Sequence, residues 1–118
     1  MSRTAVTPQT PKGPYFSPSA GQLDLTETAA DTSNNNSFAM TGAEVLLAHN
    51  TDVSTHHITL TSIADSKGRT GDISTYAVGA GKISAFSFRG GSEGWQQSDG
   101  NVYFSADDAT VKFTVLRF

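Results

Sequence analysis

The chain has 118 residues, of which 36% are hydrophobic and 16% charged, and its formal net charge is −3. This length predicts a single domain with one core, and the lack of a clustered positive excess argues against a nucleic-acid partner. The chain has no cysteine, so we expect no disulfide and no cysteine metal site. It has no apolar run long enough to cross a bilayer and no apolar leader, so we expect no membrane partner.

The prolines divide the chain, because all four lie within its first 18 residues. Proline fixes φ and cannot donate to a strand ladder, so residues 1–21 are predicted as an extended arm and residues 22–118 as a β-sandwich domain. The arm is either a disordered terminus or is ordered on a partner surface that covers its two aromatic residues. The residues expected to make that partner contact are Pro8, Pro11, Pro14, Tyr15, Phe16 and Pro18.

Beyond the arm, short β-prone runs alternate with clusters of Gly, Asn, Asp and Ser. The predicted strands are residues 23–28, 44–49, 56–63, 72–78, 82–88, 95–97, 102–105 and 109–118. Residues 31–37 are predicted as a loop, and hairpin turns are predicted at residues 79–81, 98–101 and 107–108. About eight strands with turns at this spacing predict an all-β fold, an antiparallel β-sandwich or a jelly-roll-like barrel.

Two of the predicted strands have informative side-chain patterns. Residues 45–47 form the most continuous apolar run, which is typical of a central strand covered on both faces. In residues 109–118, apolar Val111, Phe113 and Val115 alternate with polar residues. That alternation predicts one face toward the core, in a strand that lies within a sheet.

Three histidines, His49, His56 and His57, are the candidates for a metal site. Zinc needs three or four converging ligands, but neighbouring residues of a strand point to opposite faces, and no carboxylate stands at a compact spacing beside His56 and His57. We therefore expect no metal and no other cofactor. No Gly-x-Ser-x-Gly motif is present, and Asp107-Asp108 fall in a predicted turn, so we expect no catalytic residue and no enzymatic activity.

The aromatic residues suggest contacts rather than chemistry. Tyr103 and Phe104 are neighbours in one predicted strand, so one of them must lie outside the core, covered by the arm or part of an interface. Trp95 or Tyr103 could also form a carbohydrate platform, although no cluster of polar partners supports it in the sequence.

Several stretches of the chain together resemble the small capsid decoration proteins, also called cement or auxiliary head proteins, of tailed bacteriophages. They are residues 7–15, 23–26, 41–47, 49–51, 68–73, 94–100 and 111–117. The resemblance spans nearly the whole chain, but its motifs are structural and none is a catalytic fingerprint. His56, His57 and residues 34–36 lie outside it.

The resemblance implies a structural virion protein that is made in the host cytoplasm, binds the outside of the head shell and stabilises the shell by bridging capsid subunits. The implied partners are the major capsid protein and further copies of this chain, in a trimer or another cyclic oligomer. Two alternatives remain. One is a tail or head–tail joining subunit, and the other is a carbohydrate-binding β-sandwich on a host-recognition structure.

Overall fold

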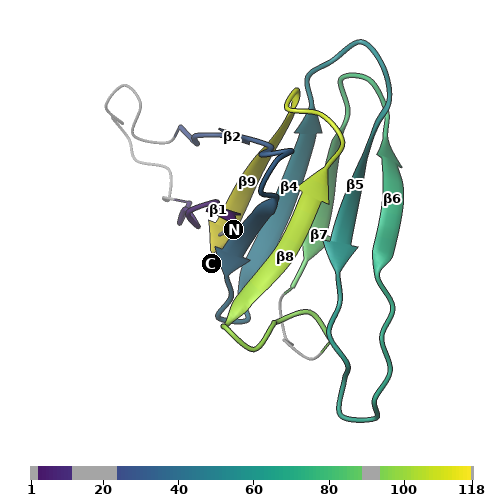
Figure 1. Cartoon of the computed structure of the whole chain (residues 1–118). Helices are drawn as coiled ribbons and strands as arrows, with labels where there is room; N and C mark the ends of the chain where they lie inside the picture. The colour runs from purple at the N-terminus through teal and green to yellow at the C-terminus, as the bar shows by residue number, and fades with distance from the viewer. Residues whose placement is uncertain (1–2, 12–23, 89–93, 118) are drawn as a thin grey trace.

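The computed structural model describes residues 3–11, 24–88 and 94–117, which form two facing sheets and contain no helix (Figure 1). Sheet A has five strands in the order β1 (Thr4–Ala5), β3 (Asn36–Ala39), β8 (Asn101–Ala106), β5 (His56–Thr61) and β6 (Ile73–Val78). Sheet B has four strands in the order β2 (Thr28–Ala29), β9 (Val111–Arg117), β4 (Glu44–Asn50) and β7 (Ile83–Ser87). In the described ranges, no helix is long and apolar enough to cross a membrane.

Strands β2 to β9 pair in nested order, which defines the topology. The outermost pair is β2 with β9, followed inward by β3 with β8, β4 with β7 and β5 with β6. Antiparallel pairings of β4 with β9 and of β5 with β8 complete the two sheets. This nesting, one long hairpin rolled across two sheets, is the jelly-roll arrangement. The prediction of an all-β fold, an antiparallel β-sandwich or a jelly-roll-like barrel, is therefore confirmed.

The nested pairing makes two of the predicted hairpins wrong. Residues 79–81 connect β6 in sheet A to β7 in sheet B, and residues 107–108 connect β8 in sheet A to β9 in sheet B. In a nested roll only the innermost pair, β5 and β6, is consecutive in the chain. The turn chemistry was recognised correctly, but local sequence does not specify whether the chain returns to the same sheet or crosses to the other.

Three predicted element boundaries also need correction. Strand β3 begins within residues 31–37, which were predicted as a loop. Its Asn36 is fully buried, and the side-chain amide of Asn36 accepts from Asp31 N at 2.9 Å and donates to the carbonyl oxygen of Thr4 at 3.2 Å. Of the predicted strand 23–28, residue 23 lies outside the described residues, and among the others only Thr28 is in a strand, β2. The predicted strand 95–97 is reduced to one bridge between Gln96 and Val102.

The core lies between the sheets and is built by the inward positions of the long strands. Phe104 and Phe113 pack edge to face with their ring centroids 4.6 Å apart, and Phe38 packs in the same way on Phe88 at 5.5 Å. The alternation predicted for the last strand is confirmed, because its apolar members are fully buried. The buried apolar residues of the sheet B strands are Leu46, Ala48, Val111, Phe113 and Val115, and Phe88, which follows β7, is buried with them.

Residues 3–11, which we call the N-terminal strap, cross from one sheet to the other and close one side of the sandwich. The N–H of Thr4 donates to Asn35 O at 2.9 Å, on the edge of sheet A. The N–H of Gln9 donates to Val115 O at 2.8 Å, and the N–H of Arg117 donates to Gln9 O at 2.9 Å, on the edge of sheet B. The strap thus pairs with backbone groups that an open edge would leave unsatisfied.

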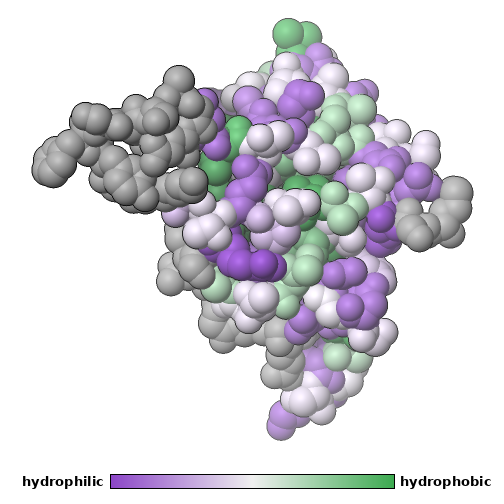
Figure 2. Space-filling model, turned by 90° about the vertical axis from the view of Figure 1, so that its left-hand side faces the viewer, coloured by the Kyte–Doolittle hydropathy of each residue, from purple (hydrophilic) through white to green (hydrophobic). Residues whose placement is uncertain are grey.

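Val6 of the strap is 1% exposed and belongs to the core. The predicted extended arm over residues 1–21, separate from a β-sandwich domain over residues 22–118, is therefore not confirmed. The prolines did not prevent this docking, because Pro8 and Pro11 flank Gln9 and leave its N–H free to pair. Figure 2 views this side of the molecule, where hydrophilic and hydrophobic residues are interspersed over the described surface.

The opposite side of the sandwich is closed by side chains. Edge strands β6 and β7 belong to different sheets, and Tyr76 meets Phe86 between them in an edge-to-face contact with centroids 5.6 Å apart. One side of the roll is therefore held by backbone hydrogen bonds and the other by an aromatic pair.

Replacing Val6→Ala tests whether the strap belongs to the fold. The change removes two buried carbon atoms, so we expect the free energy of unfolding to fall by about 2–3 kcal/mol. Denaturant unfolding measures this, with Thr7→Ala, an exposed neighbour, as the matched control that stays near wild type. An unchanged midpoint for Val6→Ala would show that the strap contributes nothing to the core.

Candidate functional site

The residues predicted to contact a partner lie partly within the described chain. Pro8 is half-buried and Pro11 is exposed, both in the strap. Pro14, Tyr15, Phe16 and Pro18 lie outside the described residues. The structure therefore places two of the six predicted contact residues and does not place the aromatic pair.

The strap is fixed at both ends by side chains. The guanidinium of Arg3 lies 4.3 Å from the centroid of the Tyr103 ring, so Tyr103, which faces away from the core, is covered by an N-terminal residue as one alternative predicted. Near the other end, the side-chain amide of Gln9 donates to Thr26 O at 2.6 Å and accepts from Thr26 N at 2.9 Å. The chain positions that flank residues 12–23 are thus joined to each other.

Asp31 joins the first residues of the strap to the β2–β3 connection. It accepts hydrogen bonds from the hydroxyl of Thr4 and from the backbone N–H groups of Ser33 and Asn34. These hydrogen bonds, that of Thr4 above all, lower the pKa of Asp31 to about 2. The carboxylate is therefore charged at neutral pH and serves as a structural acceptor.

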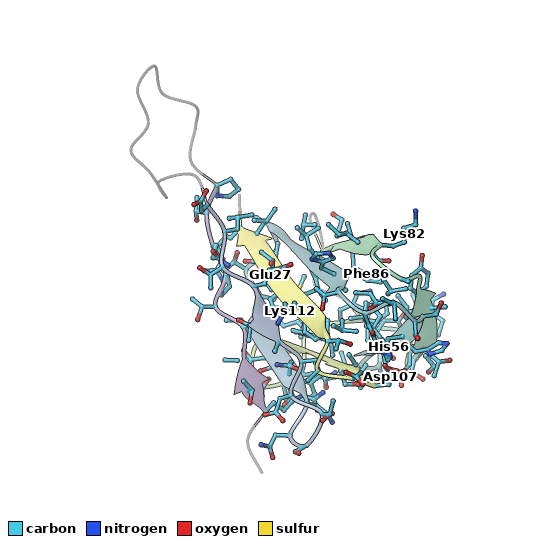
Figure 3. The ribbon with its side chains drawn as sticks, turned by 90° about the horizontal axis from the view of Figure 1, so that it is seen from above. Glu27, His56, Lys82, Phe86, Asp107 and Lys112 are labelled. Atoms are coloured by element: carbon cyan, nitrogen blue, oxygen red, sulfur yellow. The ribbon has the colours of Figure 1, made fainter. Side chains whose placement is uncertain are left out.

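The three histidines each pair with a carboxylate instead of converging. His49 Nδ1 lies 2.9 Å from Glu27 Oε2, on the outer side of sheet B. His56 Nε2 lies 2.7 Å from Asp52, and its Nδ1 lies 3.0 Å from Asp107. Figure 3 labels His56 and Asp107 near each other in the view from above. Among the described residues, no group of three potential ligands is placed to hold a metal ion.

The environment of His56 favours its charged form. A hydrogen bond to Asp52 raises the pKa of His56, against the opposing effect of burial, and Asp107 and Asp108 raise it further. His57 Nδ1 also reaches Asp107, at 3.3 Å. Both neighbouring imidazoles reach one carboxylate because Asp107 lies in the β8–β9 connection beyond the end of the sheet. The cluster of Asp52, His56, His57 and Asp107 links the β4–β5 connection to the β8–β9 connection, and it contains no serine or cysteine nucleophile.

Glu44 is the one fully buried carboxylate in the described chain, with 0% of its surface exposed. Its Oε1 accepts from the N–H groups of Thr41, Gly42 and Ala43 at 2.9–3.2 Å, and its Oε2 accepts from Arg117 Nε at 2.5 Å. Gly42 has φ +104°, a conformation that glycine adopts without strain and that turns its N–H toward the carboxylate.

These contacts make Glu44 structural. Burial alone would raise the pKa of Glu44, but the hydrogen bonds from Arg117 and Thr41 outweigh it and lower the pKa to about 2. Every lone pair of the carboxylate faces a donor of the β3–β4 connection or of β9, so no acceptor is left for a ligand. The sequence showed no sign of this role.

The outer faces of the two sheets differ, and this difference is the strongest functional feature of the described chain. The outer face of sheet A is polar, with Thr59, Thr61 and Ser105 beside the covered Tyr103. The outward positions of sheet B are mainly apolar, and Ile83 is 61% exposed. We call the following residues the apolar face of sheet B: Val45, Leu47, Ile83, Ala85 and Leu116.

The apolar run at residues 45–47 was the sequence signal for this face. It predicted a strand covered on both faces, and Leu46 does point into the core. Val45 and Leu47 point to the other side, where they are half-exposed. The described residues form only two layers, so no third layer from them covers this side.

Comparisons of the chain with protein-family models, with curated proteins and with solved structures gave no match.

The role of Glu44 can be tested by acid unfolding. Because its pKa is lowered in the folded state, its contribution to stability is present above its unfolded pKa of 4.5 and is lost as pH falls toward 2. As the pH falls from 4.5 to 2, we expect the free energy of unfolding to drop by about 3 kcal/mol more in wild type than in Glu44→Gln, because the glutamine side chain cannot titrate. Denaturant unfolding at a series of pH values measures this. Equal acid sensitivity of the two proteins would contradict the assignment.

Proposed function

We propose that the chain is a bacteriophage capsid decoration protein, a structural and non-enzymatic component that binds the outside of the head shell and bridges capsid subunits. The observation that carries the proposal is the apolar face of sheet B, which contrasts with the polar outer face of sheet A. The sequence resemblance to phage decoration proteins gives the partner. The jelly roll is compatible with this role but is shared by many unrelated functions, so the fold by itself is weak support.

The apolar face of sheet B is suited to docking on another protein. In an antiparallel sandwich the outer face is normally polar, and burying an apolar outer face gains about 25 cal/mol per Å² removed from water. Polar residues stand beside the apolar ones on this face, because Ser87 is paired in register with Val45 and Thr114 with Leu47. At one end, Lys112 is paired in register with His49, which is bonded to Glu27. A mixture of apolar and polar residues is the usual composition of a protein interface.

Residues 12–23 supply the second proposed contact, which rests on the sequence. Tyr15 and Phe16 are the aromatic anchors, Pro14 and Pro18 limit the entropy lost on docking, and Pro8 and Pro11 extend the contact along the strap. The bonding of Gln9 to Thr26 supports this, because it fixes where the segment leaves the domain and where it returns.

Repetition would strengthen both contacts. We propose that the chain binds as a trimer or another cyclic oligomer at a symmetry axis of the shell, where each copy reaches the same surface of the major capsid protein. Several weak contacts made at once give a total affinity well above that of one. The alternative function, a tail or head–tail joining subunit, predicts a different number of copies per particle. A joint holds few copies of its subunit, whereas a shell holds many.

The first test addresses the apolar face of sheet B. We expect the double variant Leu47→Thr/Ile83→Ser to bind undecorated heads at least tenfold more weakly, because the docking surface becomes polar while both residues remain compatible with a strand. The matched control is Val53→Ser, which removes a more exposed apolar side chain (91%) from the β4–β5 connection. Sedimentation of heads with increasing protein measures occupancy. Equal occupancy for the double variant and wild type would exclude this face.

The second test addresses the aromatic anchors. We expect Tyr15→Ala/Phe16→Ala to lower occupancy on the same heads while the melting temperature stays at the wild-type value, because we propose that these two residues contact the shell and not the core between the two sheets. Thermal unfolding and the sedimentation assay measure the two quantities. Wild-type occupancy would remove the aromatic pair from the contact, and a lower melting temperature would place it in the fold.

A further inference from the structure

A polar pocket of about 410 Å³ lies at the end of the sandwich where the β5–β6 hairpin loop projects beyond the sheets (Figure 1). Its walls come from the end of β5, from that loop and from the segment that precedes β8. The lining residues are Ser62, Ile63, Asp65, Arg69, Thr70, Gly71, Gly94 and Trp95. The volume falls within the range of small-molecule sites.

The loop wall is organised by Asp65. Its Oδ1 accepts from the backbone N–H groups of Lys67 and Arg69, each at 2.9 Å, and its Oδ2 accepts from Arg69 Nε at 2.9 Å. The hydrogen bonds from Arg69 and Lys67 lower the pKa of Asp65, so the carboxylate is charged at neutral pH. Arg69 uses only its Nε in this pair, and its side chain is 75% exposed, so its terminal nitrogens can donate to a ligand.

The loop is also tied to the framework at its base. Asp72 accepts from both the N–H and the hydroxyl of Ser62 at 2.7 Å, and the N–H of Gly71 donates to Ser62 Oγ at 2.9 Å. The N–H of Ile63 donates to Gly94 O at 2.9 Å and joins the loop to the segment that carries Trp95. The walls are therefore held in place before a ligand arrives, which lowers the entropy cost of binding.

Trp95 gives this polar pocket an aromatic wall. Its ring packs edge to face on the buried Phe88 with centroids 6.2 Å apart, so its orientation is set by the core. It remains half-exposed and lines the pocket. An oriented indole beside a carboxylate, a guanidinium and a hydroxyl is a specific combination of binding groups.

We propose that this pocket binds a short saccharide. A sugar ring has an apolar C–H face that can lie on the Trp95 indole, and a rim of hydroxyl groups that can donate to Asp65 and accept from Arg69. A phosphate ligand is disfavoured because Asp65 already neutralises the guanidinium of Arg69. A purely apolar ligand would leave these polar walls desolvated and unpaired.

The saccharide site is independent of the proposed shell contact. Its lining residues lie in the connections at one end of the roll, whereas the apolar face of sheet B lies on the outer side of that sheet. A chain docked through sheet B would therefore keep this end accessible. Trp95 was one candidate for a carbohydrate platform in the sequence, where no polar partners could be identified for it. In the folded chain, the β5–β6 loop places polar side chains beside Trp95.

The single tryptophan of the chain reports directly on the pocket. Titrations of the intact protein with maltotriose, cellotriose, chitotriose and lactose, followed by tryptophan fluorescence, should give a saturable change for at least one of these saccharides. Arg69→Ala should weaken that binding at least tenfold. Lys67→Ala is the matched control, because it removes a positive charge from the same loop at a residue that does not line the pocket, and it should bind within twofold of wild type.

Near-ultraviolet circular dichroism of the free variants checks that each remains folded. Amide shifts in nuclear magnetic resonance spectra, recorded over the same titration, should fall on the lining residues. The absence of a saturable change with all four saccharides would overturn the proposal. Wild-type affinity in a folded Arg69→Ala variant would overturn it as well.

Discussion

The hydrogen bonds that the N-terminal strap makes to both sheets are the constraint on which the rest of the sandwich depends. Residues 4 and 9 pair with the edges of sheet A and sheet B, and Val6 fills the core between them. On the same side, Glu44 joins the β3–β4 connection to the end of β9 through Arg117. Backbone pairing and the ion pair of buried Glu44 with half-buried Arg117 thus hold the side of the sandwich that carries β1 and the end of β9 (Figure 1). On the opposite side, Tyr76 contacts Phe86 across the two sheets.

The outer faces of sheet A and sheet B are suited to different surroundings. Sheet A faces outward with threonines, serines and a tyrosine covered by Arg3, a surface suited to water. Sheet B faces outward with Val45, Leu47 and the largely exposed Ile83, a surface suited to another protein. The loops at the end of the roll, including the one that carries Arg69, belong to neither face. The fold therefore separates a docking side from an end that remains available for a ligand.

The sequence was sufficient for what depends on local pattern. Period-two alternation located β9 and its core residues, and the Val45–Leu47 run indicated a strand with two apolar faces. It was insufficient where distant partners decide the structure. Asn36 was predicted in a loop, and the hydrogen bonds that its side-chain amide makes to Asp31 and to Thr4 of the strap form only in the folded chain. The prolines suggested a free arm because no local pattern shows that Gln9 pairs with β9. The polar partners of Trp95 come from a loop more than twenty residues away in the chain, so spacing did not reveal the pocket.

Cryo-electron microscopy of the phage particle, with this chain located in the map, tests the central proposal most directly. We expect many copies on the outer surface of the head, each with the apolar face of sheet B against the major capsid protein, the polar face of sheet A toward solvent and Trp95 at an accessible end. Copies confined to the tail or to the head–tail joint, or a chain docked through sheet A, would contradict it.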